Sequence, residues 1–408
     1  MRRPQKEGAT MATIAQGALE TLIALQTPSP KGYRGVPVLV WGMPGVGKST
    51  FIESLAQEDY PVLTLIASLH DPTDFNGLPT LQDGRVRFAP PEWVEPFERH
   101  GRGILFLDEL TTAPPTVQAA LLRLVLERRL GAYALPNEVS IAAAANPPDI
   151  AASGWELSPP LANRFVHLQW SLPAEAYREA LEQGMFEPAP HIQIDRSAHT
   201  AWLYYWRAVV AGFLKRSPQM QLTQPAENEY AFASPRTWDY AIALMASCDL
   251  LGYAPRPDVP DRQTRPFVNL VHGAIGSGAA TPFLQYLRQL RIPDPEEVLK
   301  GTVQVDTALR EDELMTLFGA MTGLLLQAME QNAPHTATYI EHYLQGALRV
   351  GQAKKPDAIY MSLRRLVREG RLHQFIRRNP NTQRLLQQLS HYYEDIAKIL
   401  EDILEPKL

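Results

Sequence analysis

The sequence predicts an α/β fold in which helices cover a parallel sheet, followed by a helical lid and a helical C-terminal extension. Three observations predict it. Short apolar runs alternate with helical segments over residues 36–172, a glycine-rich loop follows the first run, and strand-like patterns nearly vanish after Pro173. Strands that alternate with helices are typical of parallel sheets with covered faces.

Four apolar runs are predicted to be buried strands, because they are short and are bounded by glycine, proline or polar residues. They are residues 36–41, 62–67, 103–107 and 139–145. Helical spacing predicts a helix over residues 11–25 and another that starts near Lys48. Residues 80–88 carry an Asp-Gly turn between alternating residues, which predicts a hairpin, and residues 130–135 are expected to form a shorter one.

The length of the chain favours more than one domain. At 408 residues it exceeds the size at which a single hydrophobic core usually stops growing. We expect an N-terminal tail and helix over 1–35, an αβα domain over 36–172, a helical lid over 173–300 and a helical extension over 301–408. The extension should end in an amphipathic helix with Tyr393, Ile399 and Leu404 on its apolar face.

Composition indicates an ordinary globular protein, with 45% hydrophobic and 20% charged residues. The formal net charge of -5 provides no general basic field, so non-specific nucleic-acid binding is disfavoured. Cys248 is the one cysteine, and a lone thiol suits the reducing cytosol. No apolar run is long enough for a membrane span or resembles a signal peptide. We therefore expect a cytoplasmic protein.

The segment from Gly42 to Thr50 has the spacing of a phosphate-binding loop, a glycine followed after four residues by Gly-Lys-Ser. Glycines let backbone amides curl around phosphate oxygens, and the helix that follows favours negative charge at its start. Lys48 is expected to reach the outer phosphates and Ser49 to bind Mg2+. The residues expected to bind the nucleotide are Gly42, Pro44, Gly45, Val46, Gly47, Lys48, Ser49 and Thr50. ATP is favoured over GTP because no Asn-Lys-x-Asp guanine-reading motif is present.

Two acidic residues follow the third predicted strand. At the carboxyl end of a parallel sheet, Asp108 and Glu109 would face the same crevice as the phosphate loop. Asp108 is expected to hold Mg2+, directly or through water. Glu109 is expected to orient or deprotonate the attacking water, the additional role that hydrolysis requires.

With these motifs in place, the chain resembles the AAA+ ATPases and, within them, the MoxR family. The resemblance covers about the first two thirds of the chain, and segments 74–79 and 88–93 look like the helix-2 insertion of that family. It rests on five motifs in order, at residues 42–50, 105–109, 145–147, 161–165 and 234–236. The implied fold is an AAA+ αβα nucleotide domain with a helical lid.

The resemblance also implies roles for three further residues. Asn146 matches sensor 1, whose amide binds the attacking water or the terminal phosphate. Arg164 matches the arginine finger, which can bind phosphate charge through its guanidinium. Asn163 precedes it where related sequences often carry Asp. Arg236 matches sensor 2, an arginine at the start of a lid helix that contacts the nucleotide.

The expected function is ATP hydrolysis in a homo-oligomeric ring that remodels a protein client in a chaperone-like way, and the expected ring is a hexamer. MoxR-like proteins are commonly linked with partners that carry a von Willebrand factor A domain, which is an implication of the resemblance. Two alternatives remain open. One is a nucleic-acid translocase or loader that uses arginines of the insertions, such as Arg85 and Arg87. The other is a slow ATP-dependent switch that recruits partners.

Overall fold

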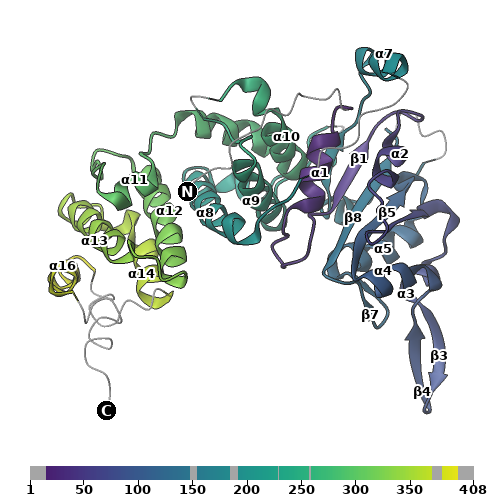
Figure 1. The fold of residues 1–408 in the computed structure, drawn as a ribbon, viewed down its shortest axis with the longest axis horizontal. Helices are drawn as coiled ribbons and strands as arrows, with labels where there is room; N and C mark the ends of the chain where they lie inside the picture. The colour runs from purple at the N-terminus through teal and green to yellow at the C-terminus, as the bar shows by residue number, and fades with distance from the viewer. Residues whose placement is uncertain are drawn as a thin grey trace. The chain divides into compact units, whose positions relative to one another are not determined.

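The computed structural model describes residues 15–147, 154–183, 192–227, 229–256, 259–369 and 379–393 (Figure 1). The chain divides into two compact units, one within residues 1–199 and 221–282, the other within 200–220 and 283–408. Helices α8 (Arg196–Arg216) and α10 (Arg265–Gln289) each contribute to both units, so this division cuts through the segment assigned to the lid. The four-part domain division stays a prediction.

The first unit contains a five-stranded parallel sheet with the order β2-β5-β8-β1-β9. Its strands are β1 (Val38–Trp41), β2 (Val62–Ile66), β5 (Arg102–Asp108), β8 (Glu138–Ala145) and β9 (Val166–Gln169). The four predicted strands are confirmed with ends shifted by one or two residues. The fifth, β9, was missed because it has only four residues and includes His167 and Gln169, which hide the apolar pattern. The α/β fold class is confirmed.

The parallel register places the carboxyl ends of the strands at one edge of the sheet. Trp41, the last residue of β1, pairs with Ala145 on one side and with Gln169 on the other. The phosphate loop, the acidic pair and Asn146 all follow strand ends of this kind. The amino ends form the opposite edge, where Val38 pairs with Val166.

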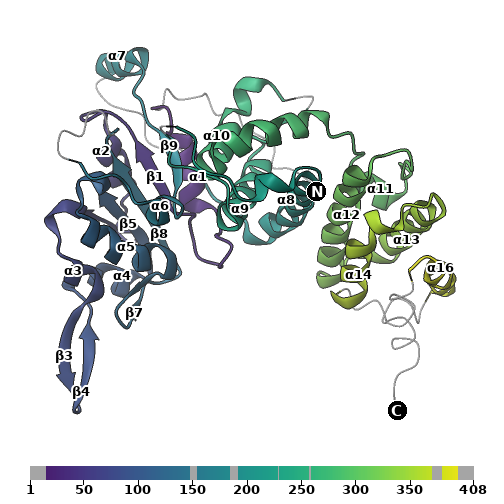
Figure 2. The same cartoon turned by 180° about the vertical axis from the view of Figure 1, so that it is seen from behind.

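Helices pack on both faces of this sheet, because side chains along a strand alternate between faces. Leu39, Leu105 and Ile141 lie in one apolar cluster with residues of α5 (Pro115–Glu127). Helix α1 (Ala18–Gln26) contacts β1, β8 and β9, and Figure 2 shows it beside these strands from behind. The other α-helices that lie wholly within this unit are α2 (Lys48–Glu53), α3 (Pro72–Asn76), α4 (Glu95–His100), α6 (Pro159–Ala162), α7 (Ala174–Gln183) and α9 (Pro235–Leu250).

The described part of the second unit is helical. A buried cluster that includes Phe318, Tyr343, Leu363 and Leu389 joins its helices. These helices are α11 (Pro295–Lys300), α12 (Glu311–Glu330), α13 (Thr336–Gln352), α14 (Tyr360–Glu369) and α16 (Pro380–Ser390). The start of the predicted helix over 11–25 and most of the predicted terminal helix after Tyr393 lie outside the described residues. Among the helices described, none combines the length and apolar character that crossing a bilayer requires.

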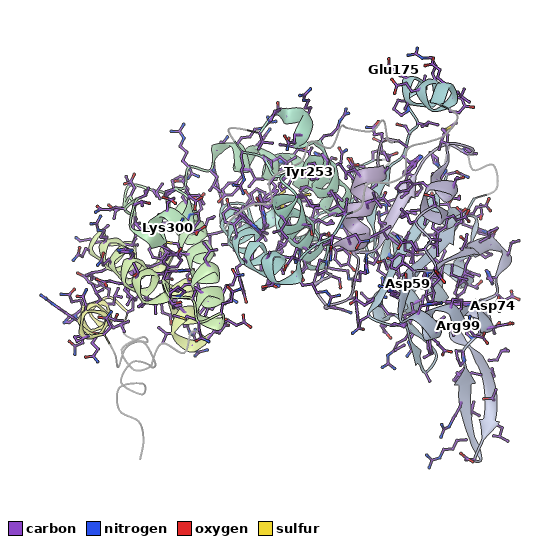
Figure 3. All side chains as sticks on the ribbon, viewed as in Figure 1. Asp59, Asp74, Arg99, Glu175, Tyr253 and Lys300 are labelled. Carbon is purple, nitrogen blue, oxygen red and sulfur yellow. The ribbon has the colours of Figure 1, made fainter. Side chains whose placement is uncertain are left out.

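Both predicted hairpins are present. Strands β3 (Leu78–Gln82) and β4 (Arg85–Ala89) pair around the Asp-Gly turn, and β6 (Arg129–Leu130) pairs with β7 (Tyr133–Ala134). The first hairpin projects from the αβα layers in Figure 1, and its side chains stand away from the body of the unit, beyond the labelled Asp74 and Arg99, in Figure 3.

Candidate functional site

The phosphate loop lies between β1 and α2, as its spacing predicts. Gly45 and Gly47 have positive φ values of 76° and 85°, a conformation that glycine adopts without the steric penalty of a side chain. A Cβ at Gly42 would lie 2.7 Å from the backbone oxygen of Trp170, so a glycine is needed there for packing. The glycines thus serve two purposes: Gly45 and Gly47 shape the loop, and Gly42 allows the residue that follows β9 to approach it.

Lys48 lies across the mouth of this loop. Its Nζ donates hydrogen bonds to the Gly42 oxygen at 2.7 Å, the Met43 oxygen at 2.9 Å and Asn146 Oδ1 at 3.0 Å. Burial lowers the pKa of the Lys48 ammonium, and the nearby Asp108 carboxylate opposes that shift. The structure therefore brings Lys48 and Asn146, which are 98 residues apart, to one point.

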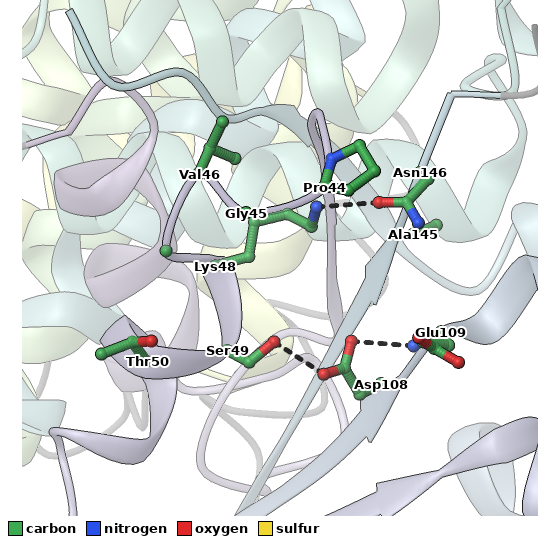
Figure 4. Close-up of a pocket in the computed structure, with 11 residues that line it drawn as sticks. Pro44, Gly45, Val46, Lys48, Ser49, Thr50, Asp108, Glu109, Ala145 and Asn146 are labelled. Carbon is green, nitrogen blue, oxygen red and sulfur yellow. Dashed lines mark hydrogen bonds between the residues drawn. The ribbon is translucent and has the colours of Figure 1, made fainter. Parts of the chain in front are cut away.

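Ser49 and the acidic pair form the other side of the site (Figure 4). The Ser49 hydroxyl donates to Asp108 Oδ2 at 2.6 Å, and the backbone N–H of Glu109 donates to Asp108 Oδ1 at 2.8 Å. Glu109 has φ 54° and ψ 40°, a left-handed conformation that is uncommon outside glycine and that often marks functional sites. Asp108 is thus held in place, and the Glu109 carboxylate is exposed to solvent.

These residues enclose a cavity of about 280 Å3. The hydroxyl of Ser49 and the carboxylate of Asp108 are hard oxygen donors, which suit Mg2+ when phosphate and water oxygens complete its shell. The described part of the chain holds no cluster of three His, Cys, Asp or Glu residues able to bind a metal by itself. The residues that line the cavity are Pro44, Gly45, Val46, Gly47, Lys48, Ser49, Thr50, Asp108, Glu109, Ala145 and Asn146.

Arg164 and Arg236 lie elsewhere. Arg164 lies two residues before β9, and the N–H of Val166 donates to the oxygen of Pro37, which precedes β1. Both positions are at the amino edge of the sheet, whereas the phosphate loop follows the carboxyl end of β1. At about 3.3 Å per residue, the four residues of β1 separate the two edges by about 13 Å.

Arg236 lines a second cavity, of about 540 Å3, that includes Pro37 and Asn163. Burial and, secondarily, the positive charge of Arg236 lower the pKa of the Arg164 guanidinium. Both arginines therefore lie at the edge of the sheet opposite the phosphate cavity.

Sequence reasoning missed the aromatic residues that support the loop. Trp170 donates from Nε1 to the oxygen of Val46 at 3.0 Å and packs on Phe51 with ring centroids 4.9 Å apart. The ring of Trp41 stacks on Tyr230, from the segment before α9, with centroids 4.8 Å apart and an interplanar angle of 4°. Trp41, at the end of the predicted strand that leads into the loop, was the available signal, whereas Trp170 follows β9, which the sequence did not reveal.

His167 connects the two edges of the sheet. Its Nδ1 accepts from Trp41 Nε1 at 2.9 Å, and its Nε2 is 2.9 Å from the oxygen of Ala162, in the turn that leads to Arg164. Burial lowers the pKa of His167 to about 4. The ring is therefore neutral at pH 7, with its proton on Nε2, because Nδ1 is already an acceptor.

Comparison with known proteins identifies the central part of the first unit. Residues 37–165 match the family described as "AAA domain (dynein-related subfamily)". No curated protein sequence matches the chain. Similar solved structures include a "putative ATPase" from Cytophaga hutchinsonii, at 16% identity and a TM-score of 0.39, covering 66% of this chain and 87% of that one.

A second similar structure is a full-length MCM homolog from Methanopyrus kandleri, at 17% identity and a TM-score of 0.35. The match covers 66% of this chain and 54% of that protein, so it leaves nearly half of that protein without a counterpart. The family match and the strand arrangement together show an AAA fold, with a five-stranded parallel sheet, covering helices and a helical C-terminal region.

Proposed function

We propose that this chain is an AAA+ ATPase of the MoxR type that binds ATP with Mg2+ and hydrolyses it. The observation that supports the proposal most is the convergence of Lys48, Ser49, Asp108 and Asn146 on one cavity, through contacts of 2.6 to 3.0 Å. No other arrangement in the described chain combines a phosphate loop with oxygen donors for Mg2+.

Each residue has a distinct proposed task. The phosphate loop amides and Lys48 hold the phosphates, and Ser49 with Asp108 holds the metal. Bound Mg2+ supplies charge that offsets the negative charge of the phosphates. Glu109, whose carboxylate is exposed beside Asp108, orients the water and accepts its proton, and Asn146 positions that water or the terminal phosphate.

The proposal includes a homo-oligomeric ring. Arg164 and Arg236 lie at the edge of the sheet opposite the phosphate cavity, so their charges are poorly placed to serve the nucleotide of their own subunit. In a ring, that edge of one subunit faces the nucleotide of the next. We therefore place both arginines on a neighbour's phosphates, with a hexamer as the expected assembly.

The basic experiment measures ATP binding and phosphate release by the full chain, with Lys48→Ala as the comparison. The unchanged protein should bind ATP in the presence of Mg2+ and release phosphate, and the variant should do neither, because it lacks the cation that offsets the phosphate charge. Equal ATP affinity in the two proteins, measured by calorimetry, would contradict the site.

The β3–β4 hairpin is the proposed contact for a protein client. Leu81 and Val86 face each other in its register and are 77% and 64% exposed, as is usual for a surface that binds an apolar partner. By the resemblance to MoxR proteins, a partner with a von Willebrand factor A domain would present or direct that client.

Replacing Leu81 and Val86 by serine should therefore abolish the stimulation of ATP turnover by an unfolded polypeptide such as reduced, carboxymethylated lactalbumin. ATP turnover in the absence of the polypeptide should be unchanged. Leu69→Ser is the matched control, because Leu69 is 76% exposed but lies outside the hairpin. Equal stimulation of the unchanged protein, the double variant and Leu69→Ser would exclude the hairpin as the contact.

A nucleic-acid translocase is the second candidate function, because Arg85 and Arg87 are exposed on the same hairpin. It would be favoured if single-stranded DNA or RNA stimulated turnover and if Arg85→Ala with Arg87→Ala removed that effect. A slow recruitment switch would instead show ATP-dependent partner binding with little turnover.

A further inference from the structure

The turn that carries Arg164 follows a helix that is too short to stabilise itself. Helix α6 has four residues and begins with two prolines, which lack a backbone N–H. The last carbonyls of a helix have no partner within it. The oxygen of Ala162 accepts instead from the N–H of Phe165 at 3.1 Å and from His167 Nε2 at 2.9 Å. A side chain of β9 therefore closes the turn in which Arg164 lies.

Three neighbours hold the His167 side chain and backbone. Trp41 Nε1 donates to Nδ1 at 2.9 Å, which leaves Nε2 as the nitrogen that carries the proton. The ring of Tyr230 lies at 18° to the imidazole, with centroids 6.1 Å apart. A Cβ at Gly273 of α10 would lie 2.3 Å from the His167 oxygen, so a glycine is needed for that helix to pack here. The imidazole would have to break these contacts in order to turn or to change tautomer.

The position of the Arg164 side chain depends on this turn. Its backbone N–H donates to the oxygen of Leu161 at 3.0 Å, and its Nη1 donates to the oxygen of Pro160. Both acceptors belong to α6, so a shift of the turn would move the guanidinium with it. A misplacement of about 1 Å can cost about a hundredfold in rate when a group must meet a reacting centre.

We propose that His167 is a positioning residue for Arg164: its Nε2–H bond to the Ala162 carbonyl holds the turn so that Arg164 reaches the phosphates bound by a second copy of this chain. This rests on the proposed ATPase function and on the proposed role of Arg164 in a neighbouring subunit. His167 does not line the phosphate cavity, so it acts through the turn and not on the nucleotide. The bond from Trp41 selects the tautomer that can donate.

Three variants separate the contacts of His167. In His167→Gln the amide nitrogen can occupy the place of Nε2 and donate to Ala162. The shorter side chain of His167→Asn reaches only the place of Nδ1, where its oxygen can accept from Trp41. His167→Phe keeps a ring of similar size for packing against Tyr230 and loses both hydrogen bonds. All three side chains are neutral, as the imidazole is at pH 7.

The experiment measures phosphate release by the full chain and by each variant. Turnover should stay within about threefold of the unchanged protein in His167→Gln and fall by about ten- to a hundredfold in His167→Asn and His167→Phe, because only the glutamine can hold the turn. ATP affinity, measured by calorimetry, should be unchanged in all three, because other residues line the phosphate cavity. Adding Lys48→Ala subunits should restore part of the activity of His167→Asn, because they supply a correctly held Arg164.

Other roles for His167 predict other orders of activity. A packing role makes His167→Phe the most active variant, and a role through Trp41 makes it His167→Asn. Either order, or equal turnover of the variants and the unchanged protein, overturns the inference. Loss of ATP binding in His167→Asn, or mixed rings that regain no activity, also overturns it. Each of these results leaves the ATPase proposal intact, whereas absence of ATP hydrolysis in the unchanged protein overturns both.

Discussion

Arg164→Ala is expected to bind ATP with unchanged affinity and to hydrolyse it about three to five orders of magnitude more slowly, the range known for arginine fingers in other NTPases. The physical reason is that charge spreads over the terminal phosphate oxygens in the transition state, and a guanidinium can bind two of them. Binding should survive because Arg164 lies at the edge of the sheet opposite the phosphate cavity.

Calorimetry and phosphate release measure the two effects separately. Arg99→Ala is a suitable control, because Arg99 is an exposed arginine of the same unit that lines neither cavity. Turnover of Arg164→Ala close to that of this control would remove Arg164 from the chemistry. Loss of ATP binding in Arg164→Ala would instead indicate that the residue supports its own nucleotide site.

Glu109→Gln is expected to retain ATP and Mg2+ binding and to lose about a hundredfold or more of its turnover, as general-base substitutions do. The amide keeps the size of the side chain but accepts a proton poorly. The hydrogen bond from the backbone N–H of Glu109 to Asp108 does not involve the side chain, so the metal site should be preserved.

Single-turnover phosphate release under saturating ATP measures this effect. Glu92→Gln provides the control, because Glu92 is an exposed glutamate outside the cavity. If Glu109→Gln hydrolysed ATP as fast as Glu92→Gln, Glu109 would not be the base.

The site at the carboxyl edge could be predicted from the sequence because its parts are local. The phosphate loop is one continuous segment, and Asp108, Glu109 and Asn146 each follow an apolar run whose direction in a parallel sheet is fixed. Such residues meet at one edge whatever the details of packing. Their placement around one cavity agrees with that reasoning, while their chemical roles stay predictions.

The arrangement around Asn163 could not be predicted in the same way. Asn163 and Arg236 are 73 residues apart, and their hydrogen bond depends on how α9 packs against the turn before β9. The stacking of Tyr230 on Trp41 is equally remote in sequence. The short strand β9 was missed because polar residues interrupt it, so the edge at which Arg164 lies was not visible before the fold was known.

The central claim is that one subunit supplies the cavity and the next supplies the arginines. Mixing Arg164→Ala subunits with Lys48→Ala subunits tests it most directly, because each variant is expected to be inactive alone and each supplies what the other lacks. We predict that mixed rings regain part of the ATPase activity, with a maximum at intermediate ratios. If mass measurements show that mixed rings form and no activity returns at any ratio, the shared site is contradicted and Arg164 must act within its own subunit.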